Sequence, residues 1–158
     1  MYDYFTLELG IPVYTHPIEL KVEGKSILVG HGDGLGPGDK SYKFLKKVFT
    51  NPIAQWIFRW FHPDLGIKLA KGWSGHSRIT NLEKDENRFL GEDEWLWTYC
   101  KNLEQRKHHD FYIFGHRHLP TELSVHTSST YFNLGEWVTP TTFLAFDGQK
   151  ATLTTVQE

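Results

Sequence analysis

The sequence predicts one mixed α/β domain in which a helical segment separates two groups of strands. Three observations predict it. Apolar residues alternate or run together in residues 1–38 and 107–158, whereas in residues 39–106 they recur at the 3.6-residue spacing of helices. The length of 158 residues suits a single domain. The content of 39% hydrophobic and 15% aromatic residues is enough for a core and excludes a disordered chain.

Residues 1–38 are expected to form short strands. Ile18, Leu20 and Val22 alternate with polar residues, residues 23–25 form a turn, and residues 27–29 are continuously apolar. This pattern predicts a hairpin that leads into a buried strand.

Residues 39–106 are expected to be helical because caps and prolines divide an apolar period into segments. The expected helices are one capped by Asp39, one that begins with Asn51 and Pro52 and is closed by Pro63, one from Asp64 toward Ala70, and one from Asp93 to Gln105.

Residues 107–158 return to strands. Residues 111–115 form a buried apolar run, and Asp147-Gly148 is the clearest hairpin turn. The other expected strands are 122–126, 129–134, 141–146 and 151–156.

Acidic and basic residues nearly balance over the whole chain, but the basic residues are concentrated in one segment. The formal net charge of −2 argues against general nucleic-acid binding. Between Lys40 and Trp73, however, seven basic residues accompany the single acid Asp64 and several tryptophans and phenylalanines. Such a mixture is typical of surfaces that meet anionic lipid or phosphate. Amphipathic helices that pack on their own core are the alternative.

Two further features of the sequence indicate where in the cell the protein is expected. No apolar run approaches the roughly 18 residues of a spanning helix, so we expect a soluble or peripheral protein. The single Cys100 forms no internal disulfide, which suits a reducing cytosol and excludes a cysteine-based zinc knuckle.

Two histidine motifs share one context. The apolar residues 27–30 end in Gly30 and are followed by His31. Residues 111–115 end in Gly115 and are followed by His116, with His118 two residues later. Loops at the carboxyl ends of strands are where α/β sheets place ligands, and imidazole is a common metal ligand. A glycine beside each histidine lets a backbone or an ion approach closely. The pattern therefore predicts that three imidazoles converge on a metal.

Other polar residues have simpler interpretations. The remaining histidines are interpreted as structural, with His76 left open. Asp33 either orients a neighbouring group or caps a turn beside Gly32 and Gly34. Arg78, Glu92 and Asn133 receive no assignment.

These motifs carry a resemblance. GHGD at residues 30–33 and GHRH at residues 115–118 resemble the last two motifs of the calcineurin-like metallophosphoesterases, which hold two divalent metals at the rim of a β-sandwich. Asp39, the aromatic helical insertion and the set Ser77, Asn81 and Lys84 are similar to the UDP-2,3-diacylglucosamine pyrophosphohydrolases within that family.

The resemblance implies roles for individual residues. His31 and His116 would bind one metal and His118 the other, with manganese the expected ion, and His116 would also lie near the scissile phosphate as a catalytic residue. Asp39, Ser77, Asn81 and Lys84 would bind substrate. The spacing of residues 77, 81 and 84 independently places a hydroxyl, an amide and an ammonium on one helix face, although a solvated polar face explains it equally well.

The implied activity is hydrolysis of the diphosphate of UDP-2,3-diacylglucosamine to UMP and 2,3-diacylglucosamine 1-phosphate in lipid A biosynthesis. The implied location is the cytoplasmic surface of the inner membrane. Within residues 39–106, the lid from about Lys40 to Trp73 would contact this surface and receive acyl chains. The alternatives are a metallophosphoesterase for another nucleotide-linked substrate and a non-catalytic module that binds lipid or metal.

The resemblance covers only the C-terminal half of the family's domain. The family motifs Asp-x-His, Gly-Asp-x-x-Asp and Gly-Asn-His do not occur in this sequence. We therefore expect a single partial domain over residues 1–158, an incomplete metal site, and a chain that is inactive or incomplete by itself. Exposed sheet edges would favour self-association.

Overall fold

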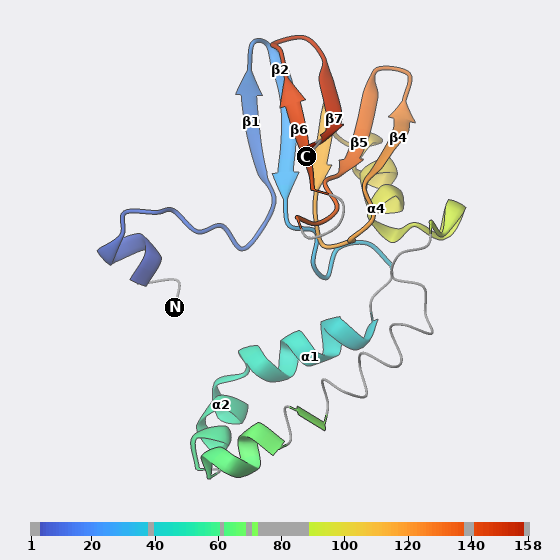
Figure 1. The fold of residues 1–158 in the computed structure, drawn as a ribbon. Helices are drawn as coiled ribbons and strands as arrows, with labels where there is room; N and C mark the ends of the chain where they lie inside the picture. Colours follow the sequence, from blue (N-terminus) through green and yellow to red (C-terminus); the bar gives the residue numbers. More distant parts are fainter. Residues whose placement is uncertain are drawn as a thin grey trace.

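The computed structural model describes residues 4–37, 40–60, 62–68, 71–72, 89–137 and 141–156 (Figure 1). It confirms the mixed α/β fold, with a five-stranded mixed sheet, a two-stranded sheet and helices. The assignment of the chain to one partial domain stays a prediction.

The first strands form the expected hairpin. β1 (Ile18–Val22) and β2 (Lys25–Gly30) pair antiparallel around a turn in which Glu23 and Gly24 both have positive φ. The segment before them differs from the prediction of short strands, because Tyr4–Glu8 forms a π-helical turn, η1, and residues 9–17 contain no strand.

The main sheet has the order β1-β2-β3-β5-β4. β3 (Phe111–Phe114) is parallel to its neighbours β2 and β5 (Ser129–Asn133), and β4 (Thr121–His126) is antiparallel to β5. Parallel pairing brings the carboxyl ends of β2, β3 and β5 to one edge. This edge carries both histidine motifs.

Side-chain alternation in β3 connects the sheet to a layer on each face. Tyr112 and Phe114 face α4 (Trp95–Glu104), which follows a short 3-10 helix, η2 (Gly91–Asp93). Phe111 contacts Phe146 of the second sheet, formed by β6 (Thr142–Phe146) and β7 (Ala151–Thr155), with ring centroids 5.7 Å apart. Figure 1 shows the β6–β7 hairpin in front of the main sheet.

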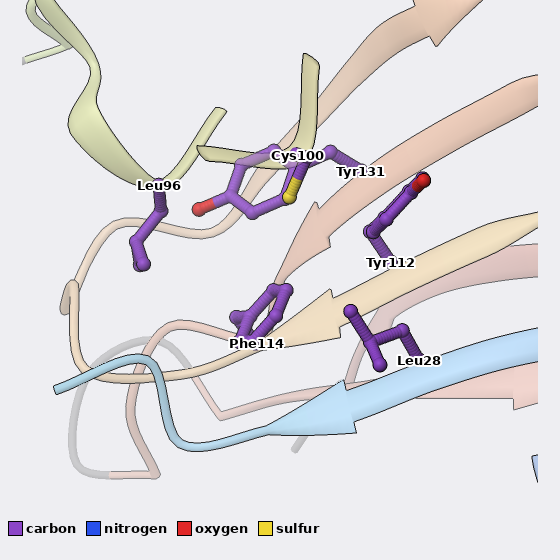
Figure 2. Packing of buried hydrophobic residues seen from close by; sticks show 6 residues of the cluster. All are labelled: Leu28, Leu96, Cys100, Tyr112, Phe114 and Tyr131. Carbon is purple, nitrogen blue, oxygen red and sulfur yellow. The ribbon is translucent and has the colours of Figure 1, made fainter. Parts of the chain in front are cut away.

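A compact core lies between α4 and the main sheet. Figure 2 shows its six members, contributed by α4 and by three neighbouring parallel strands: Leu28, Leu96, Cys100, Tyr112, Phe114 and Tyr131. Each is at most 4% exposed. Full burial of one such side chain contributes about 1.5–3 kcal/mol, so this cluster fixes α4 over the strands that carry the histidines.

The described residues of the middle of the chain are mostly helical, as predicted. α2 (Pro52–Arg59) has the expected cap, because Asn51 Oδ1 accepts hydrogen bonds from the backbone of Ile53 and Ala54. The prediction for Pro63 was wrong. Helical structure resumes at residues 63–68, so Pro63 begins that helix, where its fixed φ and missing N–H are tolerated.

The insertion exposes much of its apolar surface. α1 (Lys40–Thr50) and α2 contact each other, and Figure 1 shows them apart from the sheets. Trp56 is 59% exposed and Trp60 77%, and α2 contains no buried residue. Within the described residues, α2 therefore does not pack on a core, and the surface interpretation fits better. None of the helices in this part of the structure is both long and apolar enough to cross a membrane.

Candidate functional site

Two adjacent parallel strands place His31 and His116 at the same edge of the main sheet. Gly30 of β2 is paired with Phe114 of β3, and the next residues continue the pairing, since the Gly115 N–H donates to the His31 carbonyl at 3.0 Å. The imidazoles of His31 and His116 meet edge to face, with centroids 5.3 Å apart and planes at 79°. The expectation that these motifs meet is therefore met for these two side chains.

The backbone of His116 is unusual. Its φ is +66°, which is uncommon for a residue with a Cβ, and the Arg117 N–H donates to the Gly115 carbonyl at 2.8 Å across it. His116 is thus the central residue of a γ-turn whose φ matches the rare, strained form. Such strain is kept only where surrounding contacts determine the conformation, and it gathers at functional sites.

His118 lies on the same loop and its side chain is 58% exposed. Its Nδ1 is 3.6 Å from Glu136 Oε2, a carboxylate that follows β5. Glu136 was not singled out from the sequence, because its approach to His118 depends on the order of strands in the sheet. The convergence of His118 on the other two imidazoles stays a prediction.

The glycines beside the histidines have different reasons to be small. A Cβ on Gly30 would lie 3.0 Å from Phe114 and 3.1 Å from Pro17, so protein side chains fill that space. A Cβ on Gly115 would make only an ordinary 3.6 Å contact with His31 Nδ1. The sequence led us to expect a close approach at both glycines. The structure shows one at Gly30, where the neighbours are side chains of the protein itself.

Arg117 points into the protein from between the two histidines. It is 5% exposed, its Nε lies 3.2 Å from Glu94 Oε1, and its guanidinium lies 4.8 Å from the ring centre of Trp95. Burial raises the pKa of Glu94, while the positive charge of Arg117 acts in the opposite direction. The pair fastens the GHRH loop to the start of α4, a role that the sequence did not reveal.

Asn133 is a second residue that sequence reasoning missed. It is 1% exposed at the end of β5, and its Nδ2 donates to the Gly115 carbonyl at 2.7 Å. Its Oδ1 accepts from the Gly135 N–H at 3.0 Å. The sequence did contain a signal for it: Asn133 is a polar residue at the end of an apolar strand, as the histidine motifs are.

Asp33 connects the site to the insertion. Its Oδ2 lies 2.7 Å from Lys46 Nζ on α1, and Lys43 Nζ donates to the carbonyl of Gly36 in the same loop. The loop after His31 therefore holds the first helix of the insertion. The orienting role and the turn-cap role expected for Asp33 both stay predictions.

The substrate-binding set cannot be placed. Asp39, Ser77, Asn81 and Lys84 lie outside the described residues, as does His76. Their predicted roles stay predictions.

The described residues near His31 and His116 supply only part of a metal centre. His31 and His116 offer two adjacent imidazoles at the ends of neighbouring strands, which suits a divalent transition metal. In the described ranges, however, no group of three or more His, Cys, Asp or Glu side chains is arranged to hold a metal. Two adjacent dications need a carboxylate to offset their repulsion, so these residues alone do not fit a two-metal site.

Comparison with known proteins identifies relatives along nearly the whole chain. It is 31% identical to the UDP-2,3-diacylglucosamine hydrolase of Porphyromonas gingivalis over 99% of this chain and 64% of that protein. It is 30% identical to the Edwardsiella ictaluri protein of the same name over 80% of this chain and 49% of the relative. The Yersinia enterocolitica protein of that name is 26% identical over 84% of this chain and 55% of its own length. The chain matches no protein-family model.

The chain spans about half to two thirds of the length of these relatives. This share agrees with the expected resemblance to part of a metallophosphoesterase domain. Over nearly its whole length, this chain is therefore similar to part of the UDP-2,3-diacylglucosamine hydrolases.

Proposed function

We propose that this chain is part of a hydrolase that cleaves the diphosphate of UDP-2,3-diacylglucosamine in lipid A biosynthesis. Water adds across the bond between the two phosphoryl groups, and the products are UMP and 2,3-diacylglucosamine 1-phosphate. The observation that carries the proposal is the 31% identity to the Porphyromonas gingivalis protein over 99% of the chain. The adjacent imidazoles of His31 and His116 support it, because they form a rigid polar site at a sheet edge.

We also propose that the complete site uses two divalent metals, with manganese as the expected ion. His31 and His116 would serve one metal and His118 the other, and His116 would lie nearest the phosphate. The described residues supply too few ligands for this set, so the proposal includes further ligands from outside them. The chain by itself is accordingly proposed to be inactive or incomplete.

The helical insertion is proposed to contact the cytoplasmic face of the inner membrane. Its support is the exposure of Trp56 and Trp60, whose rings pack against each other at 5.8 Å, on a segment rich in lysine. Aromatic rings and basic side chains together favour the interface of an anionic bilayer. A surface of this kind also suits an acylated substrate.

Self-association is proposed to involve unpaired sheet edges. β1 is an edge strand of the main sheet, and the second sheet contains only β6 and β7 among the described residues. Unpaired strand edges are templates for pairing with another chain.

A non-catalytic module that binds lipid or metal is the second candidate, favoured by the incomplete ligand set. A phosphoesterase for another nucleotide-linked substrate is the third. It would share the strand-end histidines and differ in the insertion.

The deciding experiment measures bound metal and manganese-dependent release of UMP from UDP-2,3-diacylglucosamine. It uses this chain and a version extended by the upstream sequence of its source genome. We expect turnover by the extended chain, loss of turnover in His116→Ala, and retention in His126→Ala, whose side chain is exposed on β4. Lipid binding by the short chain with no turnover by either version would favour the binding module. Faster release of UMP from another UDP-sugar would favour the third candidate.

A further inference from the structure

Asn133 is a buried polar side chain beside the candidate site. It ends β5, is paired with Phe114 of β3, and is 1% exposed. A buried amide without partners is costly, so its contacts show what the fold uses it for.

The Asn133 side-chain amide connects its own strand end to the loop that follows β3. Nδ2 donates to the Gly115 carbonyl at 2.7 Å and to the Tyr131 hydroxyl at 3.2 Å, and Oδ1 accepts from the Gly135 N–H at 3.0 Å. Both ends of the amide are therefore fixed. The shortest of these contacts reaches Gly115, the residue directly before His116.

The Gly115 peptide is held from both sides. Its N–H donates to His31, and its carbonyl accepts from the Arg117 N–H as well as from Asn133. The Arg117 bond closes the γ-turn around His116, and the Asn133 bond anchors that carbonyl to β5. A strained turn needs such an external anchor, because the turn's own hydrogen bond does not make its φ favourable.

We propose that Asn133 is a positioning residue that holds the Gly115 carbonyl and so keeps His116 in the backbone conformation that turns its imidazole toward His31. The consequence for turnover rests on the proposed hydrolase function. The geometric role does not, and it is testable without metal or substrate.

The test is the nuclear Overhauser effect between the ring protons of His31 and His116, measured in the chain as it stands. Asn133→Asp keeps the size of the side chain and an acceptor for Gly135, but removes the Nδ2 donor. We expect the ring-to-ring effect to be lost in this variant. It should persist in Asn102→Asp, an exposed position on α4, and in Tyr131→Phe, which leaves the Gly115 bond intact.

A measurement on the unmodified chain covers the case in which Asn133→Asp does not fold. The side-chain amide protons of Asn133 should exchange with solvent about tenfold or more slowly than those of exposed Asn102. Exchange at equal rates would overturn the proposal, as would a ring-to-ring effect that survives in folded Asn133→Asp.

Measuring turnover gives a second, independent test of the role of Asn133. In a form of the chain that hydrolyses the substrate, Asn133→Asp should lower kcat by about 10- to 100-fold and change KM little, as for residues that orient a catalytic group. If neither this chain nor the version extended upstream turns over, while Asn133→Asp loses the ring contact, the hydrolase function is contradicted and the positioning role is supported. Normal kcat together with a retained ring contact would overturn the positioning role alone.

Discussion

His116 adopts a strained backbone conformation at the centre of the site, and the residues that follow it anchor the loop in different directions. Arg117 points inward to Glu94, whereas His118 points outward to Glu136. A buried ion pair is seldom a net source of stability, because desolvation offsets the attraction. The Arg117–Glu94 pair instead fixes the position of the GHRH loop against the start of α4.

Glu94→Gln should destabilise the protein strongly. The substitution leaves the Arg117 guanidinium buried without its counter-charge, which costs about 3–5 kcal/mol when one partner of a buried pair is removed. The free energy of unfolding in urea measures this loss. Glu92→Gln is the matched control, because the Glu92 side chain is 85% exposed in its pair with Lys101 and should change stability by no more than about 1 kcal/mol. Equal effects of the two substitutions would contradict the geometric account.

At the scale of elements, α4 is fastened to the main sheet at both ends. Glu94 holds its start, and Glu104 holds its end through Tyr112 of β3, whose hydroxyl donates to Glu104 Oε2 at 2.6 Å. Burial alone would raise the pKa of Glu104, but hydrogen bonds lower it from 4.5 to about 2. The partners are the side chains of His108 and Tyr112 and the backbone N–H of His109.

The Glu104 contacts predict a pH-dependent stability. Because the folded pKa lies below the ordinary value, the contribution is complete above about pH 4.5 and is lost as the pH falls toward 2. Glu104→Gln should cost about 3 kcal/mol at pH 7 and flatten the fall in stability across that window. Urea unfolding at several pH values between 7 and 2 measures it. Glu122→Gln, at an exposed position on β4, should leave the profile unchanged. A Glu104→Gln profile parallel to that of the unmodified chain would show that this carboxyl does not tie α4 to the sheet.

The sequence was informative where the signal is local. Alternation located the strands, Asn51 identified a helix start, and the repeated strand-Gly-His pattern brought His31 and His116 together. Arg117 and Glu94 were missed, because they lie 23 residues apart and two charges give no sign in the sequence that they are buried together. Pro63 was misjudged because a proline closes one helix or opens the next with the same local signal.

At the scale of the whole molecule, the tight packing among the described residues lies in the strands and α4, while α2 carries its aromatic side chains outward. The contact between Asp33 and Lys46 links the two parts at the loop after His31. An apolar, basic surface joined to the site in this way would let a membrane deliver an acylated substrate to the histidine edge. The contact is a surface ion pair, so its charge adds only about 0–1 kcal/mol to the link.

The insertion should therefore bind anionic vesicles through its tryptophans. Trp60→Ser removes a ring that is 77% exposed, and because burial of a large apolar side chain is worth about 1.5–3 kcal/mol, binding should weaken by about tenfold or more. Co-sedimentation with vesicles that contain phosphatidylglycerol measures the affinity, and added salt should weaken it by screening the lysines. Trp137→Ser is the matched control, since Trp137 is 72% exposed but follows β5 rather than lying on the insertion. Equal weakening by both substitutions would show that exposed aromatic surface in general drives the binding, and the insertion would then have no specific role at the membrane.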